Sequence, residues 1–152
     1  MKLKSILFLM LGLFCSLSFV ACDDDDDPVT HTDASTLVGG TFTGSIVDAD
    51  GNEKASDVVV TVSKFEAENT QAITVKIVSA TLSMDQEGVF NVAKAGNDRY
   101  TFGNGSAAAA RNTGGVIEGN QITIYTTLSS KYKFNATSSA KRYVITCTKT
   151  AE

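Results

Sequence analysis

The sequence predicts an all-β fold: a single antiparallel up-and-down barrel of about eight strands, or alternatively a β-sandwich. Three observations lead to this prediction. From about residue 37 onward apolar residues recur at every second position, no long window has helical spacing, and Gly and Asn separate the apolar runs. The chain has 152 residues, 43% of them hydrophobic and 20% charged, which fits one globular domain.

The alternation is clearest in three segments near the start of this domain. Apolar side chains at Phe42 and Ile46, at positions 58, 60 and 62, and at positions 73, 75 and 77 alternate mostly with Thr, Ser and Lys. Further strands are predicted over residues 89–93, 99–104, 122–128, 131–136 and 142–148, with shorter ones near Thr81 and Val116. In this register the inward side chains include Val60, Val75, Ile77, Ile124, Phe134 and Ile145.

The same alternation would suit an outer-membrane barrel, which turns its apolar face towards lipid. Several predicted strands are shorter than a membrane crossing requires, and the sequence has no aromatic girdles. We therefore expect the apolar face to point inward and the polar face to meet water.

Residues that favour turns, mainly Gly, Asn and Asp, lie between the predicted strands. Residues 48–53, Asp-Ala-Asp-Gly-Asn-Glu, combine alternate acids with a glycine, as calcium loops do. The glycine comes too early for the spacing of an EF-hand, and no Glu follows at the required position. We interpret this segment as a hairpin turn.

The N-terminus has the layout of an export signal. Lys2 and Lys4 precede an apolar run over residues 6–20, which is too short to span a membrane as a helix. The run ends in Ala21-Cys22, and here the sequence resembles a bacterial lipoprotein signal, although Phe19 stands where that family usually has Leu. The resemblance implies that residues 1–21 are a signal peptide and that Cys22 becomes the acylated first residue. Two or more acyl chains on it would give stable membrane anchoring.

Five consecutive aspartates, Asp23 to Asp27, follow this cysteine and precede Pro28, the only proline. A block of like charges stays hydrated, so residues 22–36 are predicted to form an acidic tether before a β-barrel domain over residues 37–152. The tract is similar to that of surface lipoproteins of the Bacteroidetes type. This resemblance implies that the aspartates act as a signal for export to the outer face of the outer membrane, with a periplasm-facing anchor as the alternative.

A second resemblance concerns the domain itself. The phrases Gly-Thr-Phe-Thr-Gly at residues 40–44 and Gly-Val-Ile-Glu-Gly-Asn-Gln-Ile-Thr-Ile at residues 115–124 resemble those of lipocalin-like, or calycin-like, lipoprotein domains. The resemblance covers residues 37–149. It implies an up-and-down barrel with an apolar cavity for a small ligand, and it brings no catalytic residues.

The residues that most enzyme classes need are scarce. The chain has a single histidine, His31, which lies in the tether with no Cys and no second His near it. Cys147 is expected to be a buried filler without a disulfide partner. No catalytic residue, metal site or cofactor is predicted. Residues 37–152 contain equal numbers of acidic and basic residues, so we expect no positively charged surface for binding nucleic acid.

The sequence therefore predicts a non-enzymatic lipoprotein of the outer-membrane surface, whose barrel binds a small molecule or a glycan. The expected partners are the membrane, through the lipid on Cys22, and a small ligand, a glycan or an envelope protein. The glycan hypothesis rests mainly on the expected cell-surface location, with Tyr125 as a candidate for an exposed aromatic platform among aromatic residues that mostly belong to the core. The alternative is a structural or adhesive interaction module of the cell envelope that has no ligand cavity.

Overall fold

The computed structural model describes residues 34–66, 71–103, 112–135, 137 and 139–151. The chain divides into two units, Met1–His31 and Thr32–Glu152, and all of the described residues belong to the second. The predicted signal peptide and the acidic residues of the tether therefore lie outside the described residues.

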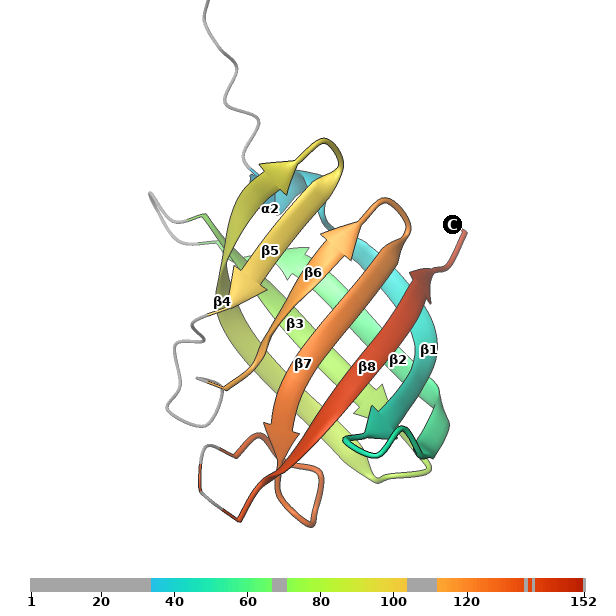
Figure 1. The fold of residues 1–152 in the computed structure, drawn as a ribbon. Helices are drawn as coiled ribbons and strands as arrows, with labels where there is room; N and C mark the ends of the chain where they lie inside the picture. Colours follow the sequence, from blue (N-terminus) through green and yellow to red (C-terminus); the bar gives the residue numbers. More distant parts are fainter. Residues whose placement is uncertain (1–33, 67–70, 104–111, 136, 138, 152) are drawn as a thin grey trace, which may run out of the picture. The chain divides into compact units, whose positions relative to one another are not determined.

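Eight antiparallel strands form a closed barrel in which each strand pairs with its neighbour in sequence and the last pairs with the first (Figure 1). The strands are β1 (Gly40–Asp48), β2 (Glu53–Lys64), β3 (Ala72–Ser79), β4 (Met84–Gly96), β5 (Arg99–Gly103), β6 (Gly114–Glu118), β7 (Gln121–Leu128) and β8 (Lys141–Lys149). The all-β, up-and-down prediction is confirmed. The sandwich alternative is wrong, because the β1–β8 pairing closes the sheet on itself.

The apolar face of the strands points into the barrel. Val60, Val75 and Ile77 are fully buried, as are Ile124 and Ile145. The residues that alternate with them on the outside, such as Thr61 and Lys76, are exposed. The predicted register is thus confirmed for these five inward positions, and the orientation is opposite to that of a membrane-spanning barrel, whose outer face is apolar.

A single helical turn, α2 (Ala34–Leu37), lies at one end of the barrel beside β2 and β4 (Figure 1). The side chains of Ala34 and Ser35 are buried, so this turn lies across the boundary that we drew between tether and domain. One turn is too short to leave a helical period in the sequence. None of the described helical residues makes an apolar span of the length needed to cross a membrane.

The predicted strand over residues 131–136 is wrong for the part that the structure describes. Residues 129–133 form a turn in which the Ser129 hydroxyl accepts hydrogen bonds from the backbone amides of Lys131 and Lys133, and Tyr132 has a φ of 52°. The alternation of aromatic and lysine residues there resembles a strand. However, of the described residues there only Phe134 pairs with a strand, in an isolated antiparallel bridge to Leu128 at the end of β7, because the tight turn at residues 129–133 leaves no room for a longer ladder.

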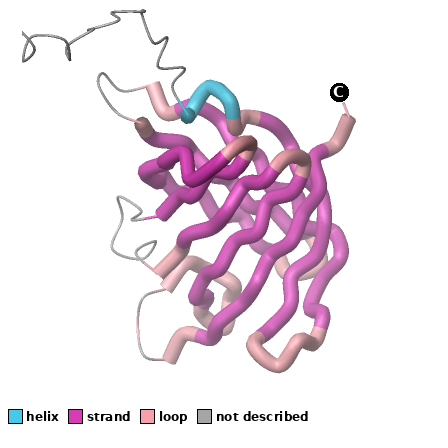
Figure 2. The backbone as a smooth tube through the Cα atoms, turned by 45° about the horizontal axis from the view of Figure 1, so that its top comes forward, coloured by secondary structure: helices cyan, strands magenta, loops and turns pink. Residues whose placement is uncertain are grey.

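Phe134 explains why that turn contains apolar residues. Its ring stands edge-on to Phe90, with 6.4 Å between ring centroids, and its backbone amide donates to the inward-pointing Gln86 side chain. The prediction that Phe134 points inward from a strand is therefore wrong. Its side chain is only partly buried and packs against the edge of the core. The β7–β8 connection lies at the end of the barrel opposite α2 (Figure 2).

The short strand predicted near Thr81 is also wrong, because residues 80–83 form a turn with Ser83 at a φ of 48°. The other short candidate, near Val116, is confirmed as β6. The strand predicted over residues 89–93 is longer than expected. Gln86 and Gly88 occupy inward positions of β4 and interrupt the apolar alternation that identified it.

Residues 48–53 form the predicted hairpin turn between β1 and β2. The Asp48 carboxylate accepts hydrogen bonds from the backbone amides of Asp50 and Asn52, at 3.1 and 2.9 Å. Gly51 has a φ of 82°, which suits glycine. The acids in this segment therefore organise the turn.

Candidate functional site

The sequence-predicted site residues fall into two groups. Cys22, Asp23, Asp24, Asp25, Asp26 and Asp27 lie outside the described residues, as does His31. Tyr125 and Cys147 are described, and both occupy the positions expected of them: Tyr125 is 56% exposed and Cys147 is 1% exposed. The described part of the site therefore centres on Tyr125 and on the strands around it.

Tyr125 points outward from β7 because it follows the fully buried Ile124. It lies directly opposite Val144 of β8, and Val144 in turn lies opposite Val47 of β1. On its other side Tyr125 is paired with Gly114 of β6. Since glycine has no side chain, nothing on β6 at this position covers that edge of the tyrosine.

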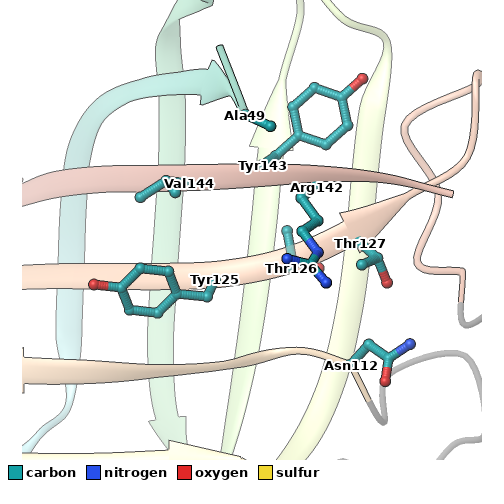
Figure 3. A pocket seen from close by; sticks show the side chains of 8 residues that line it. All are labelled: Ala49, Asn112, Tyr125, Thr126, Thr127, Arg142, Tyr143 and Val144. Atoms are coloured by element: carbon teal, nitrogen blue, oxygen red, sulfur yellow. The ribbon is translucent and has the colours of Figure 1, made fainter. Parts of the chain in front are cut away.

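A second row of outward side chains lies on the same two strands, two residues closer to the end of the barrel. Arg142 of β8 is opposite Thr127 of β7, and the exposed Asn112 precedes β6 beside them. Figure 3 shows the two rows on opposite sides of the view: Tyr125 and Val144 on one side, Arg142, Thr127 and Asn112 on the other. The first row offers an aromatic and aliphatic surface, and the second offers the donors of Arg142 and Asn112, while the Thr127 hydroxyl already donates to the Asn135 carbonyl.

Together these two rows line a groove of about 580 Å³ that is open to solvent. We call it the β7–β8 groove. Thr126 and Tyr143 lie between the rows and contribute to its lining, and Ala49 of the β1–β2 hairpin completes it. Small-ligand sites in proteins are mostly apolar concavities of roughly 300 to 1,000 Å³ with a few polar groups. The groove matches this description in size and lining, although it is more open than a cavity.

Arg142 is the only charged side chain among the described residues that line the groove. Within the described part of the chain, it makes no ion pair or hydrogen bond. The nearby carboxylate of Asp48 is engaged elsewhere, by the Lys54 ammonium at 2.7 Å. That contact, together with the backbone amide of Asn52, lowers the pKa of Asp48 to about 2. Asp48 and Lys54 thus neutralise each other and leave the Arg142 charge unopposed in the groove.

Side chains occupy the interior of the barrel. Phe42 and Phe90 are fully buried within it, and the Phe90 ring stands edge-on to Phe102 with 5.7 Å between centroids. The inward hydroxyls of Thr113 and Thr126 satisfy each other at 2.6 Å. A ligand entering this space would have to displace packed side chains, so the groove on the outer face is the more accessible site.

Cys147 has the environment of a structural thiol. It is packed in the core beside Ile145, and burial raises its pKa to about 11. A nucleophilic cysteine needs a lowered pKa and access to substrate. Among the described residues, no three His, Cys, Asp or Glu side chains cluster as metal ligands.

Sequence reasoning identified Tyr125 but missed Arg142, Thr127 and Asn112. These four residues meet only through the pairing of β6, β7 and β8, which local alternation does not reveal. One signal was available in the sequence: residues 121–151 contain basic residues and no acidic residue. The excess of basic residues in this stretch was overlooked, because acidic and basic residues are equal in number over the whole domain.

Comparisons with models of protein families, with curated proteins and with solved structures find no match to this chain. The barrel is established by its strand pairing, and the lipocalin-like resemblance of the two glycine-rich phrases stays a prediction.

Proposed function

We propose that this protein is a non-enzymatic lipoprotein of the outer-membrane surface, anchored through lipid on Cys22, whose barrel domain binds a small molecule or a glycan at the β7–β8 groove. The observation that carries the binding proposal is the exposed Tyr125 ring in a groove of ligand size that also contains Arg142, a side chain with no ion pair or hydrogen bond among the described residues. Exposed aromatic rings combine apolar area with a polar tip, which suits sugars. The anchor rests on the signal-like N-terminus.

This proposal moves the ligand from the inside of the barrel to its outer face. The lipocalin-like resemblance implied an apolar interior cavity, but the inward positions are taken by large side chains such as Phe42 and Phe90. The outer groove needs no such displacement. Binding there would require little rearrangement, since the two rows lie on neighbouring, fully paired strands.

Binding is tested by titrating the purified full-length protein, in detergent, with a panel of oligosaccharides in a calorimeter. Tyr125→Ala is expected to weaken binding by about tenfold or more, because a sugar would lose its stacking surface. Val78→Ala is the matched control, since Val78 is an exposed apolar residue on β3, outside the groove. Equal effects of the two variants would contradict binding at the groove, and failure to bind any oligosaccharide would contradict the glycan as its ligand.

Anchoring is tested separately with Cys22→Ala and labelled palmitate. We expect the variant to lose both the label and its association with membranes, while the barrel stays folded, because the described barrel faces its apolar residues inward. Undiminished palmitate incorporation would reject Cys22 as the lipid site. Neither result depends on what the domain binds.

A second candidate is a structural or adhesive module of the envelope without a ligand cavity. The filled interior favours it, because a barrel that holds no internal ligand can serve as a rigid scaffold. Its partner would be another envelope protein. Loss of such a partner with Val78→Ala but not with Tyr125→Ala would favour this candidate over the groove.

A further inference from the structure

Positive charge gathers on the part of the barrel that forms the groove. The stretch from residue 121 to residue 151, which includes β7, β8 and their connection, contains no acidic residue. Its basic residues are Lys131, Lys133, Lys141, Arg142 and Lys149. Lys149 donates to the Gly39 carbonyl at 2.9 Å, while the other four are exposed. The groove therefore lies beside a local excess of positive charge.

Acidic residues on neighbouring strands do not cancel this charge within the groove. Asp48 is held by Lys54, and Glu118, at the end of β6, lies 4.0 Å from Arg99. Asp50 and Glu53, on the β1–β2 hairpin, are not among the residues that line the groove. Among the described residues of the lining, an anionic ligand would meet Arg142 as the single charge.

The positions of Arg142 and Tyr125 bear on the length of the ligand. Tyr125 is paired with Val144, so Arg142 is its diagonal neighbour on the same face of the sheet. Diagonal neighbours on paired strands lie about 7 to 8 Å apart. Figure 3 shows the Tyr125 ring extending away from Arg142 along the strand, so an oligosaccharide that rests on the tyrosine and continues along the groove would bring the carboxylate of a neighbouring sugar unit to the arginine side chain.

We propose that the β7–β8 groove selects acidic sugars, with Arg142 holding a sugar carboxylate while Tyr125 supports the ring of a neighbouring sugar unit. This inference rests on the proposed glycan binding and adds the class of ligand. The planar guanidinium presents two parallel donors that match a carboxylate, a geometry that a lysine ammonium does not reproduce. Asn112 supplies a further polar side chain on the same side of the groove as Arg142 (Figure 3).

Uronic-acid oligosaccharides and their methyl esters provide the matched ligands for a test. Methyl esterification removes the carboxylate charge and keeps the sugar skeleton. Calorimetric titration of the full-length protein is expected to show the acids binding at least about tenfold more tightly than the esters. Raising the salt concentration should weaken binding of the acids and leave any binding of the esters nearly unchanged.

Variants of the two arginines identify the residue responsible. Arg142→Met should remove the preference for the acids, and Arg142→Lys should restore only part of it, because charge remains but the paired donors are lost. Arg99→Met is the control, since Arg99 is an exposed arginine at the start of β5, outside the groove. It should keep the full preference. All three variants should unfold at the temperature of the unmodified protein, which excludes loss of fold as the cause.

Three results would overturn the inference. Equal binding of acids and esters, unaffected by Arg142→Met, would leave glycan binding intact and reject the acidic selectivity. Stronger binding of sulfated sugars than of carboxylated ones would reject the carboxylate as the recognised group. Absence of binding to every oligosaccharide, acidic or neutral, would reject both this inference and the glycan binding on which it rests.

Discussion

Gly44 of β1 lies directly opposite Cys147 of β8 at the seam that closes the barrel. A Cβ atom on Gly44 would collide with the Thr146 carbonyl oxygen and would come within 2.6 Å of the Cys147 Cα. The absence of a side chain at this position therefore lets the first and last strands approach. Gly44 is also the final residue of the phrase at residues 40–44, so close packing accounts for a glycine that the sequence singled out.

The first prediction concerns this seam. Gly44→Ala should lower the free energy of unfolding by about 1 to 3 kcal/mol, because the methyl group meets backbone that cannot move without opening the β1–β8 pair. Chemical denaturation followed by circular dichroism measures the loss. Gly96→Ala is the control, since the nearest atom to a Cβ there is the Arg99 Cβ at an ordinary 3.8 Å. Equal stabilities of the two variants would show that the seam tolerates a side chain.

The second prediction concerns the thiol on the other side of the seam. Cys147 should react slowly with a thiol reagent at neutral pH and quickly after unfolding, because it is buried and its pKa is raised to about 11. Labelling resolved by peptide mass spectrometry separates this cysteine from Cys22. Thr146→Cys places a thiol on the exposed neighbouring position, and we expect it to react rapidly in the folded protein. Rapid native labelling of Cys147 itself would contradict its structural role.

The third prediction is a pH dependence that arises from Asp57. Its carboxylate accepts hydrogen bonds from the Ser79 hydroxyl at 2.6 Å and from the Thr81 backbone amide at 2.8 Å. The Ser79 hydrogen bond, followed by that of Thr81, lowers the pKa of Asp57 below the usual value of an aspartate carboxyl group. Because the folded state favours the ionised form, this stabilisation is complete above the unfolded pKa and is lost as the pH falls through the lowered one.

Asp57→Asn should accordingly be less stable than the unmodified protein near pH 7, and the difference should shrink as the pH falls below about 4. Urea midpoints measured across this range give the result. Asp85→Asn is the control, because Asp85 is exposed and only 3.6 Å from Lys76, and exposed ion pairs contribute little. A difference between Asp57→Asn and the unmodified protein that stays constant with pH would show that the carboxylate charge plays no part in holding the turn.

Much of the barrel could be predicted because alternation is a local property. Successive side chains of a strand point to opposite faces, so every second residue points inward. Val60 on β2, and Val75 and Ile77 on β3, could therefore be recognised as buried from their own strands. The same rule failed at Tyr132, where aromatic and lysine residues alternate in a turn. Alternation indicates which side chains are buried, but it does not show that the segment is a strand. A turn that packs against the end of the barrel also partly buries alternate side chains, as it does at Tyr132 and Phe134.

The candidate site was less predictable because it depends on contacts between strands. Tyr125 was expected on the surface from its own strand, but its neighbours Arg142 and Val144 come from β8 and are placed by register. The sequence instead predicted a further strand over residues 131–136, between the two strands that pair as β7 and β8. The site could be assembled only once the direct pairing of β7 with β8 and with β6 was known.

The last prediction concerns Asp23 to Asp27, which lie outside the described residues and follow the proposed lipid site directly. Five adjacent carboxylates repel one another and stay hydrated, so an export component can recognise them as an exposed negative patch. Changing all five to Asn should leave palmitate incorporation and thermal stability unchanged. It should move the domain from a protease-accessible position on intact cells to a protected one in the periplasm.

Two controls separate an export signal from a simple spacer. Changing the five residues to Glu keeps the charge, and we expect that variant to stay accessible to protease on intact cells. Accessibility of the Asn variant after the outer membrane is permeabilised shows that it is present behind that membrane, and its unchanged thermal stability shows that it is folded. If the Asn variant is digested on intact cells as completely as the unmodified protein, the aspartates serve only to keep the tether hydrated, and the surface location must depend on another part of the chain.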